Sequence, residues 1–148
     1  MPTLFAFLHH VFAFALVSTI AIEFTLIRGE LTLLAARRLQ AIDRVLGIAA
    51  VALLVAGLLR AVFSEKGADY YLHNRAFMTK LSMFVAIALL SIIPTVEFLS
   101  WRGVLRAGRV PAISAGKLRL VTAIIRGELL AIVIILLCAA IMARGELA

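Results

Sequence analysis

Long apolar stretches alternate with short polar segments along the whole chain. Each stretch is close to the roughly 20 residues that a helix needs to cross a bilayer core about 30 Å thick. We therefore expect membrane-spanning helices over residues 4–27, 41–63, 77–101 and 120–142. In an alternative for the first helix, it runs on through Leu31 to Ala36 as a protruding extension. The pattern predicts an all-α fold, a transmembrane four-helix bundle.

Composition makes lipid the expected solvent of this chain. Its 148 residues are 64% hydrophobic, and the mean hydropathy is +1.12. A soluble domain of this size needs far more polar surface. Four spans leave no room for a soluble domain, so residues 1–148 are predicted to form one integral membrane domain. Met1-Pro2-Thr3 has no positive charge, which argues against a removable signal peptide.

The net charge of +7 comes from basic residues that lie between the apolar stretches. The first connection carries Arg28, Arg37, Arg38 and Arg44 against Glu30 and Asp43, and the third carries Arg102, Arg106, Arg109, Lys117 and Arg119 without an acid. In the middle connection, residues 64–76, Lys66 and Arg75 are balanced by Glu65 and Asp69. Cytoplasmic loops of membrane proteins are rich in Lys and Arg. We therefore expect both termini on the periplasmic side, a lipid bilayer as partner and no nucleic acid.

Four polar side chains are expected at similar depth near the outer surface. His9 and His10 lie in the first span, Arg60 near the end of the second and Lys80 near the start of the third. A neutral imidazole is a good ligand for haem iron, and a nearby cation pairs with a haem propionate. His9 and His10 are metal-ligand candidates, and Arg60 and Lys80 complete a candidate haem b pocket. The alternative is that the histidines sit near the interface while the cations reach the headgroups.

Only one of the two histidines is expected to face the bundle. Adjacent residues on a helix are about 100° apart. Glu23 returns to nearly the same face as His9, which slightly favours His9 as the inward one.

A second group of charges is expected toward the cytoplasmic side. It consists of Glu23 and Arg28 in the first span, Glu97 in the third, and Arg126 and Glu128 in the fourth. Ion pairs between helices, for example Glu23 with Arg126, would fix the register of the bundle. The functional alternative is a proton path or a contact with a quinone or porphyrin.

Two features of the spans concern helix packing. Pro94 is expected to kink the third span, with Ser91 and Thr95 satisfying the freed backbone groups. The second span has a row of small residues, which suits close packing within the bundle or between protomers of a homo-oligomer. These are Gly47, Ala49, Ala52, Ala56 and Gly57.

Several of these residues together resemble a family of small bacterial four-span membrane proteins that is catalogued only as a domain of unknown function. The resemblance covers nearly the whole chain and implies a multi-pass protein of the bacterial inner membrane, without an established activity. It rests on His9-His10, Gly57-Leu58-Leu59-Arg60, Lys66-Gly67, Tyr70-Tyr71, Asn74, Phe77, Lys80, Ser91-Ile92-Ile93-Pro94-Thr95 and Trp101-Arg102.

A more distant similarity is to the membrane-embedded, haem-containing protoporphyrinogen oxidases of the HemJ type. These are also short four-span chains with a histidine in the first helix and a lysine in the third. The similarity implies that His9 or His10 is an axial ligand of haem b and that Lys80 assists with the cofactor or the tetrapyrrole substrate. The doubled histidine, Arg60 and the surroundings of Lys80 depart from that family.

Three functions are compatible with these patterns. The first is a haem b-binding redox protein, a tetrapyrrole or quinone oxidoreductase with Lys80 as its catalytic residue. The second is a small oligomeric transporter or channel-like protein, and the third is an accessory subunit of a membrane complex. The chain has no Walker loop, no paired histidines at metalloprotease spacing and no nucleophile elbow, so nothing supports ATP-driven or hydrolytic chemistry.

Overall fold

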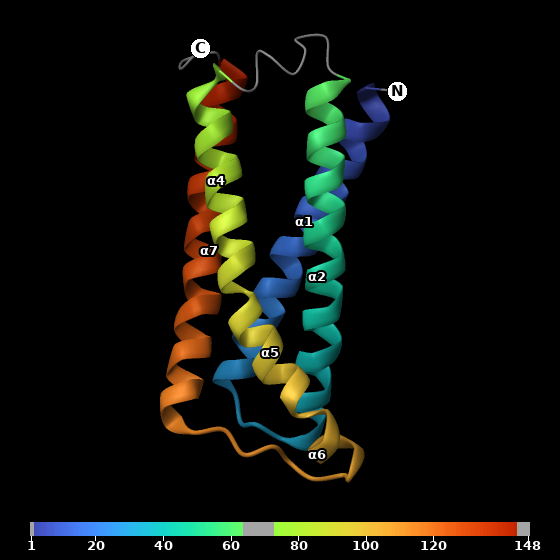
Figure 1. Ribbon diagram of the computed structural model, residues 1–148, viewed down its shortest axis with the longest axis vertical. Coiled ribbons are helices and arrows are strands. Elements are labelled where there is room, and N and C mark those ends of the chain that lie inside the picture. The colour runs from blue at the N-terminus through green and yellow to red at the C-terminus, as the bar shows by residue number, and fades with distance from the viewer. Residues whose placement is uncertain (1, 64–72, 145–148) are drawn as a thin grey trace.

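The protein is a bundle of long helices, and the computed structural model describes residues 2–63 and 73–144 (Figure 1). The elements are α1 (Pro2–Arg28), α2 (Leu33–Val62), α4 (Arg75–Leu90), α5 (Ile92–Ser100), α6 (Arg102–Arg106) and α7 (Ala115–Arg144). Four stretches are long and apolar enough to cross a membrane: Thr3–Arg28, Leu33–Val62, Phe77–Arg106 and Ala115–Ile141. The predicted all-α fold with four spans is confirmed.

The start of α1 and the end of α7 lie at the same end of the bundle, as an even number of crossings requires (Figure 1). We call this the outer end, after the predicted orientation, and the end that holds α6 the inner end. Most of the middle connection, with Glu65, Lys66, Asp69, Tyr70 and Tyr71, falls outside the described residues.

The first two spans form a tight hairpin. The hydroxyl of Thr32 accepts a hydrogen bond from the backbone N–H of Ala35 at 3.1 Å, which caps the start of α2. The expected extension of the first helix through Leu31 to Ala36 is therefore wrong. Leu33, Ala36 and Leu39 instead begin α2, and Ala36 and Leu39 are fully buried.

The third span is interrupted at Ser91, between α4 and α5. Pro94 has no N–H to offer the carbonyl one turn earlier, so the regular hydrogen-bond ladder is broken here. Above the break α4 packs against α7, and below it α5 packs against α2. Figure 1 shows the chain crossing from one side of the bundle to the other at this point.

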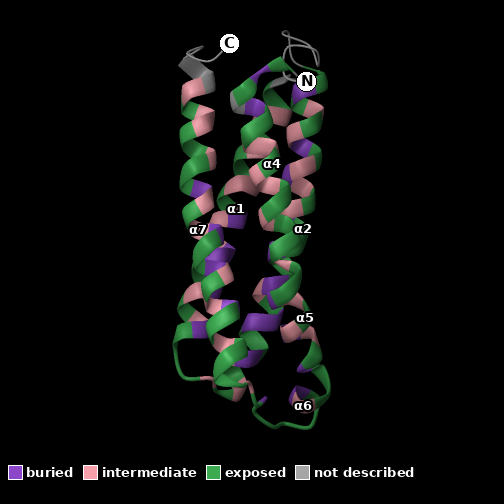
Figure 2. Cartoon of the chain, turned by 60° about the vertical axis from the view of Figure 1, so that its left-hand side comes forward, coloured by how far each residue is buried: buried purple, intermediate pink, exposed green. Residues whose placement is uncertain are grey.

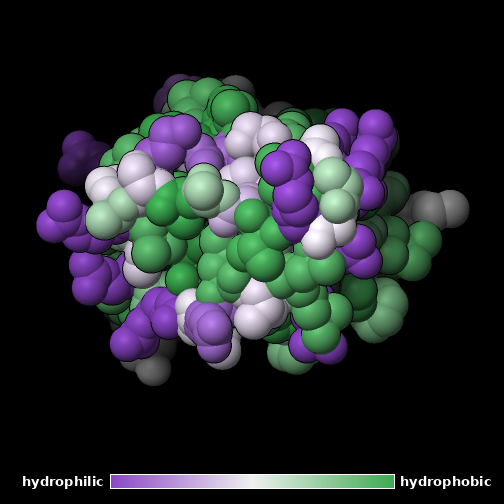
Figure 3. All heavy atoms as spheres, turned by 90° about the horizontal axis from the view of Figure 1, so that it is seen from below, coloured by the Kyte–Doolittle hydropathy of each residue, from purple (hydrophilic) through white to green (hydrophobic). Residues whose placement is uncertain are grey.

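The tightly packed core lies in the inner half of the bundle. The buried residues gather toward α5 and α6, whereas the residues of the outer half are mostly intermediate or exposed (Figure 2). The core includes Ile20, Leu39, Phe98, Trp101 and Ile125. Many large apolar side chains point outward, as expected for helices in contact with lipid. Seen from the inner end, hydrophilic side chains lie mainly around the rim of the face (Figure 3).

Candidate functional site

His9 lies inside the outer half of the bundle, where α1 packs against α2. Its imidazole rests on Gly57: a Cβ at Gly57 would lie 3.2 Å from Cε1 and 3.3 Å from Nδ1 of the ring. The ring is half-buried, and its Nδ1 atom is buried without a hydrogen-bond partner. The backbone of Leu53 provides a hydrogen-bonding contact to the side chain. His9 is thus held in place with one ring nitrogen unsatisfied.

His10 points away from this position. It is exposed, and its Nδ1 lies 2.5 Å from the carbonyl oxygen of Ala6 in the preceding turn of α1. The two rings meet edge to face, with centroids 6.1 Å apart. Of the two adjacent histidines, His9 is therefore the one that faces the bundle.

The structure brings Arg60 and Lys80 close enough to His9 for their charges to act on its imidazole. Arg60 lies on α2 near Gly57, and Lys80 lies on α4 with its ammonium 5.3 Å from the ring centroid of Phe77. Lys80 is half-buried and Arg60 is exposed. The charge of Arg60 also acts on Lys80. Two like charges beside a neutral imidazole form a place that favours an anion.

In the inner half, three carboxyl groups from three helices lie close together. Glu23 of α1, Asp43 of α2 and Glu128 of α7 are all buried. Asp43 and Glu128 act electrostatically on Glu23, and Asp43 acts on Glu128. We call these three residues the carboxyl cluster.

Two hydroxyl groups at the break of the third span satisfy part of the carboxyl cluster. Ser91 donates to Oε1 of Glu128 at 2.5 Å, and Thr95 donates to Oδ1 of Asp43 at 2.7 Å. The expectation that these hydroxyls serve freed backbone groups is therefore wrong, because they point to carboxylates.

The predicted ion pair between Glu23 and Arg126 does not form. Arg126 is exposed on α7, and the groups that act on Glu23 are acids. Arg126 and Glu128 are two residues apart, about 200° around the helix, so they point in nearly opposite directions. Glu23 and Arg126 were paired because they were expected at similar depth in the membrane, but the side chain of Arg126 points away from Glu23.

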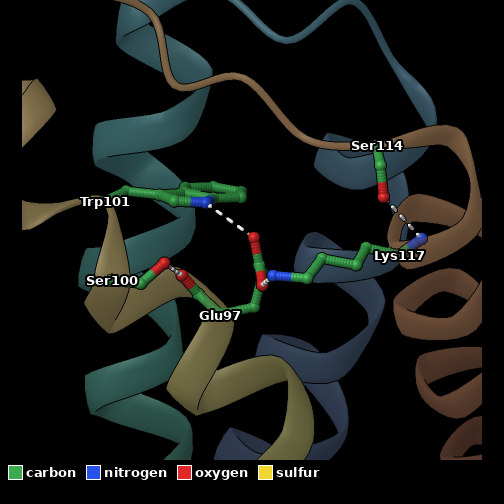
Figure 4. A network of polar contacts seen from close by, with 5 residues as sticks. All are labelled: Glu97, Ser100, Trp101, Ser114 and Lys117. Carbon is green, nitrogen blue, oxygen red and sulfur yellow. Dashed lines mark hydrogen bonds and ion pairs between the residues drawn. The ribbon is translucent and has the colours of Figure 1, made fainter.

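Glu97 belongs to a separate network at the inner end, shown in Figure 4. One carboxylate oxygen accepts the indole N–H of Trp101 at 3.1 Å, and the other pairs with the ammonium of Lys117 at 2.9 Å. Ser114 caps the turn that carries Lys117. This network joins α5 to the start of α7, so Glu97 has a structural contact and lies outside the carboxyl cluster.

Sequence reasoning missed Asp43 and Gln40. Asp43 was counted with the basic residues of the first connection, yet it lies on the buried face of α2. Ala36, Gln40, Asp43 and Leu46 recur at intervals of three or four residues, which is the signal that would have found it. The Gln40 amide donates to the carbonyl oxygen of Phe98 and so joins α2 to α5.

A pocket of about 530 Å³ opens at the inner end beside Gln40. Four arginines contribute to its wall. Its lining is Arg37, Gln40, Arg44, Arg102, Leu105 and Arg106. Gln40 lies one turn before Asp43, so the pocket reaches to within one helical turn of the carboxyl cluster.

The donor set near His9 fits a porphyrin iron better than a metal ion held by several side chains. Among the described residues, no three His, Cys, Asp or Glu side chains are grouped so that they would hold a metal ion. Haem requires only an axial ligand from the protein together with partners for its propionates. The unsatisfied Nδ1 atom of His9 and the two neighbouring cations are the groups that would hold haem here.

Comparison with known proteins assigns a family. No curated protein and no solved structure matches the chain significantly. The similarity to HemJ-type oxidases therefore stays a prediction. A family model described as "Predicted membrane protein (DUF2214)" matches residues 1–146, nearly the whole sequence. The chain therefore belongs to this family of membrane proteins.

Proposed function

We propose that the protein binds haem b in the outer half of the bundle and acts as a redox protein of the bacterial inner membrane. His9 is the axial ligand, and Arg60 and Lys80 pair with the propionates. The observation that carries this proposal is the inward imidazole of His9, which has a buried, unsatisfied nitrogen next to two cations.

Each residue has a distinct task in this proposal. An unsatisfied buried polar atom costs roughly 1–3 kcal/mol, and a ligand that uses the nitrogen of His9 removes this cost. Arg60 and Lys80 repel one another in the free protein, and a bound dianion relieves that repulsion. Because Gly57 has no side chain, the imidazole of His9 can lie against α2 in this orientation.

Haem, when bound, supplies one-electron exchange. The half-buried ammonium of Lys80 can donate a hydrogen bond to the carbonyl oxygen of a quinone or pair with a carboxylate of a tetrapyrrole, and one of these is the proposed partner. Lys80 is the proposed catalytic residue, because it is the more buried of the two cations near His9.

The first experiment is the absorption spectrum of the protein purified in detergent from haem-replete cells. It is recorded oxidised and after dithionite reduction, with a pyridine haemochrome assay for stoichiometry. We expect near-equimolar haem b. A protein that stays colourless even after haem addition would overturn the proposal.

The adjacent histidines provide a matched pair of variants. His9→Ala should lose haem, whereas His10→Ala should keep a wild-type spectrum, because His10 is exposed and bonded within α1. Lys80→Ala and Arg60→Ala should weaken haem retention without changing the axial ligand. Equal haem content in the two histidine variants would exclude His9 as the ligand.

The proposal also includes self-association through α2. Ala49 and Ala56 are buried within the bundle, which leaves Gly47 on the exposed face with open space around it. Small residues on a lipid-facing helix allow a second helix to approach closely. Mass measurement of the detergent-solubilised protein by light scattering tests for a homo-oligomer, and a monomer at all concentrations would argue against it.

A further inference from the structure

The three side chains of the carboxyl cluster are almost completely buried. Glu23 is 1% exposed, Glu128 2% and Asp43 4%. They come from the hairpin of α1 and α2 and from α7, which is distant from that hairpin in sequence. The break of the third span adds Ser91 and Thr95 between them. The bundle therefore encloses these acids from all sides.

The hydrogen bonds to the cluster are too few to stabilise three negative charges. Oε1 of Glu23 and Oε2 of Glu128 are buried and have no partner. None of the three carboxyls forms an ion pair with another described residue. Among the described residues, the one cation that acts on the cluster is Arg44, next to Asp43, and its Nε donates to the carbonyl of Gln40 at 3.3 Å.

Charged carboxylates are costly inside a bilayer, and adjacent ones repel one another further. A proton removes the charge and also turns an unpartnered oxygen into a donor. Carboxyl groups in mutual contact share protons and titrate as a unit. The described residues offer no grouping of acids suited to a metal ion, so the neutralising ligand that fits is the proton.

We propose that Glu23, Asp43 and Glu128 form a proton-binding site that retains protons at neutral pH and exchanges them with the inner aqueous phase. The groups that face it are Arg44 from α2 and the hydroxyls of Ser91 and Thr95 from the third span. The arginine-lined pocket supplies the connection to water, because Gln40 in its wall lies one turn from Asp43. The site is independent of haem, and a colourless protein would leave this proposal intact.

Infrared spectroscopy of the full-length protein in liposomes tests the proposal directly. Protonated carboxylic acids have a carbonyl stretching band that shifts in deuterated water and is absent from carboxylates. We expect this band at neutral pH, and we expect it to weaken as the pH is raised. The absence of any such band at neutral pH would overturn the proposal.

Single variants assign the band. Glu23→Gln, Asp43→Asn and Glu128→Gln should each remove one component or shift those that remain, and Glu97→Gln is the matched control because Glu97 pairs with Lys117. A band that Glu97→Gln removes and the other three leave unchanged would contradict the assignment. Each variant is checked by circular dichroism and gel filtration.

Ser91→Ala provides a test that keeps every carboxyl in place. It removes the hydroxyl that donates to Glu128, so the carbonyl component of Glu128 should move to higher frequency.

A second measurement separates protons from metal cations. Sodium chloride is added to the unsubstituted protein at fixed pH while the carbonyl band is recorded, with choline chloride as the control. Loss of the carbonyl band with sodium alone would show a metal cation in place of protons and would refute the proposal.

Discussion

The imidazole of His9 lies in the space that a side chain at Gly57 would occupy, with Cε1 3.2 Å and Nδ1 3.3 Å from the position of the missing Cβ. A glycine on α2 therefore sets how closely α1 approaches in the outer half and which way the ring faces. Gly47, on the same helix, has nothing within 4 Å of its own Cβ position. The two glycines make a controlled comparison.

Gly57→Ala should lack the increase in stability that alanine usually brings to a helix interior. Replacing glycine by alanine in a helix interior stabilises by roughly 1 kcal/mol, and Gly47→Ala should show this gain. At Gly57 the added methyl group displaces the His9 ring, so Gly57→Ala should be about 1 kcal/mol less stable than Gly47→Ala. The measurement is reversible unfolding in mixed micelles, under conditions in which the protein is monomeric, so that the proposed contact between protomers at Gly47 does not contribute. Equal stabilisation by both substitutions would show that the imidazole of His9 can move aside without a cost in stability.

Thr95→Val should destabilise the bundle, because it leaves Oδ1 of Asp43 without its donor while preserving side-chain volume. Hydrogen bonds between membrane helices contribute about 1 kcal/mol, and we expect a loss of that size. Thr25→Val is the control, since Thr25 is exposed and its hydroxyl bonds only to Ala21 in its own helix. If both variants unfold at the same denaturant concentration, the contact with Asp43 contributes nothing.

Glu97→Ala should change the fluorescence of Trp101, because it removes the acceptor of the indole N–H. Trp101 is the sole tryptophan of the chain, so its emission can be assigned without ambiguity. Lys117→Ala should have a smaller effect, because Lys117 is 63% exposed and such pairs contribute at most about 1 kcal/mol. Arg119→Ala is the neutral control. An unchanged emission maximum in Glu97→Ala would mean that the hydrogen bond is absent in the membrane.

Labelling of single cysteines should establish the orientation. Cys138 is the sole cysteine, so a Cys138→Ser background removes native reactivity. In intact cells an impermeant maleimide should react with Thr3→Cys at the outer end and not with Arg109→Cys between α6 and α7. After the cells are opened, both should react. The reverse pattern in intact cells would place the termini in the cytoplasm.

Hydropathy was sufficient for the four spans because a bilayer selects for apolar segments of a fixed length. It did not locate the start of α2, since Leu31 to Ala36 is as apolar as a continuing helix would be. The local bond between the Thr32 hydroxyl and the Ala35 N–H decided that boundary. A capping hydrogen bond depends on a few neighbouring residues, so the mean hydropathy of a long window does not detect it.

For the candidate site, the position of each polar residue within its span predicted its depth in the membrane, but it did not predict the direction in which the side chain points. His9, Arg60 and Lys80 were expected at one depth, and the structure brings them together. Arg126 was expected to meet Glu23 for the same reason, but it points outward. Asp43 was hidden by its neighbour Arg44, because charge counting treats both as parts of one loop. Helical periodicity distinguishes them: Asp43 is buried and Arg44 is exposed.

The division of the carboxyl cluster between two hairpins has a consequence for biogenesis. Synthesis proceeds from the N-terminus, so α1 and α2 bring Glu23 and Asp43 into the bilayer before the later spans exist. Thr95, Ser91 and Glu128 arrive with the second hairpin. Until then Asp43 lacks the hydroxyl of Thr95, which the second hairpin supplies. The hydrogen bond between Thr95 and Asp43 thus favours the register in which the two apolar hairpins bring these side chains together.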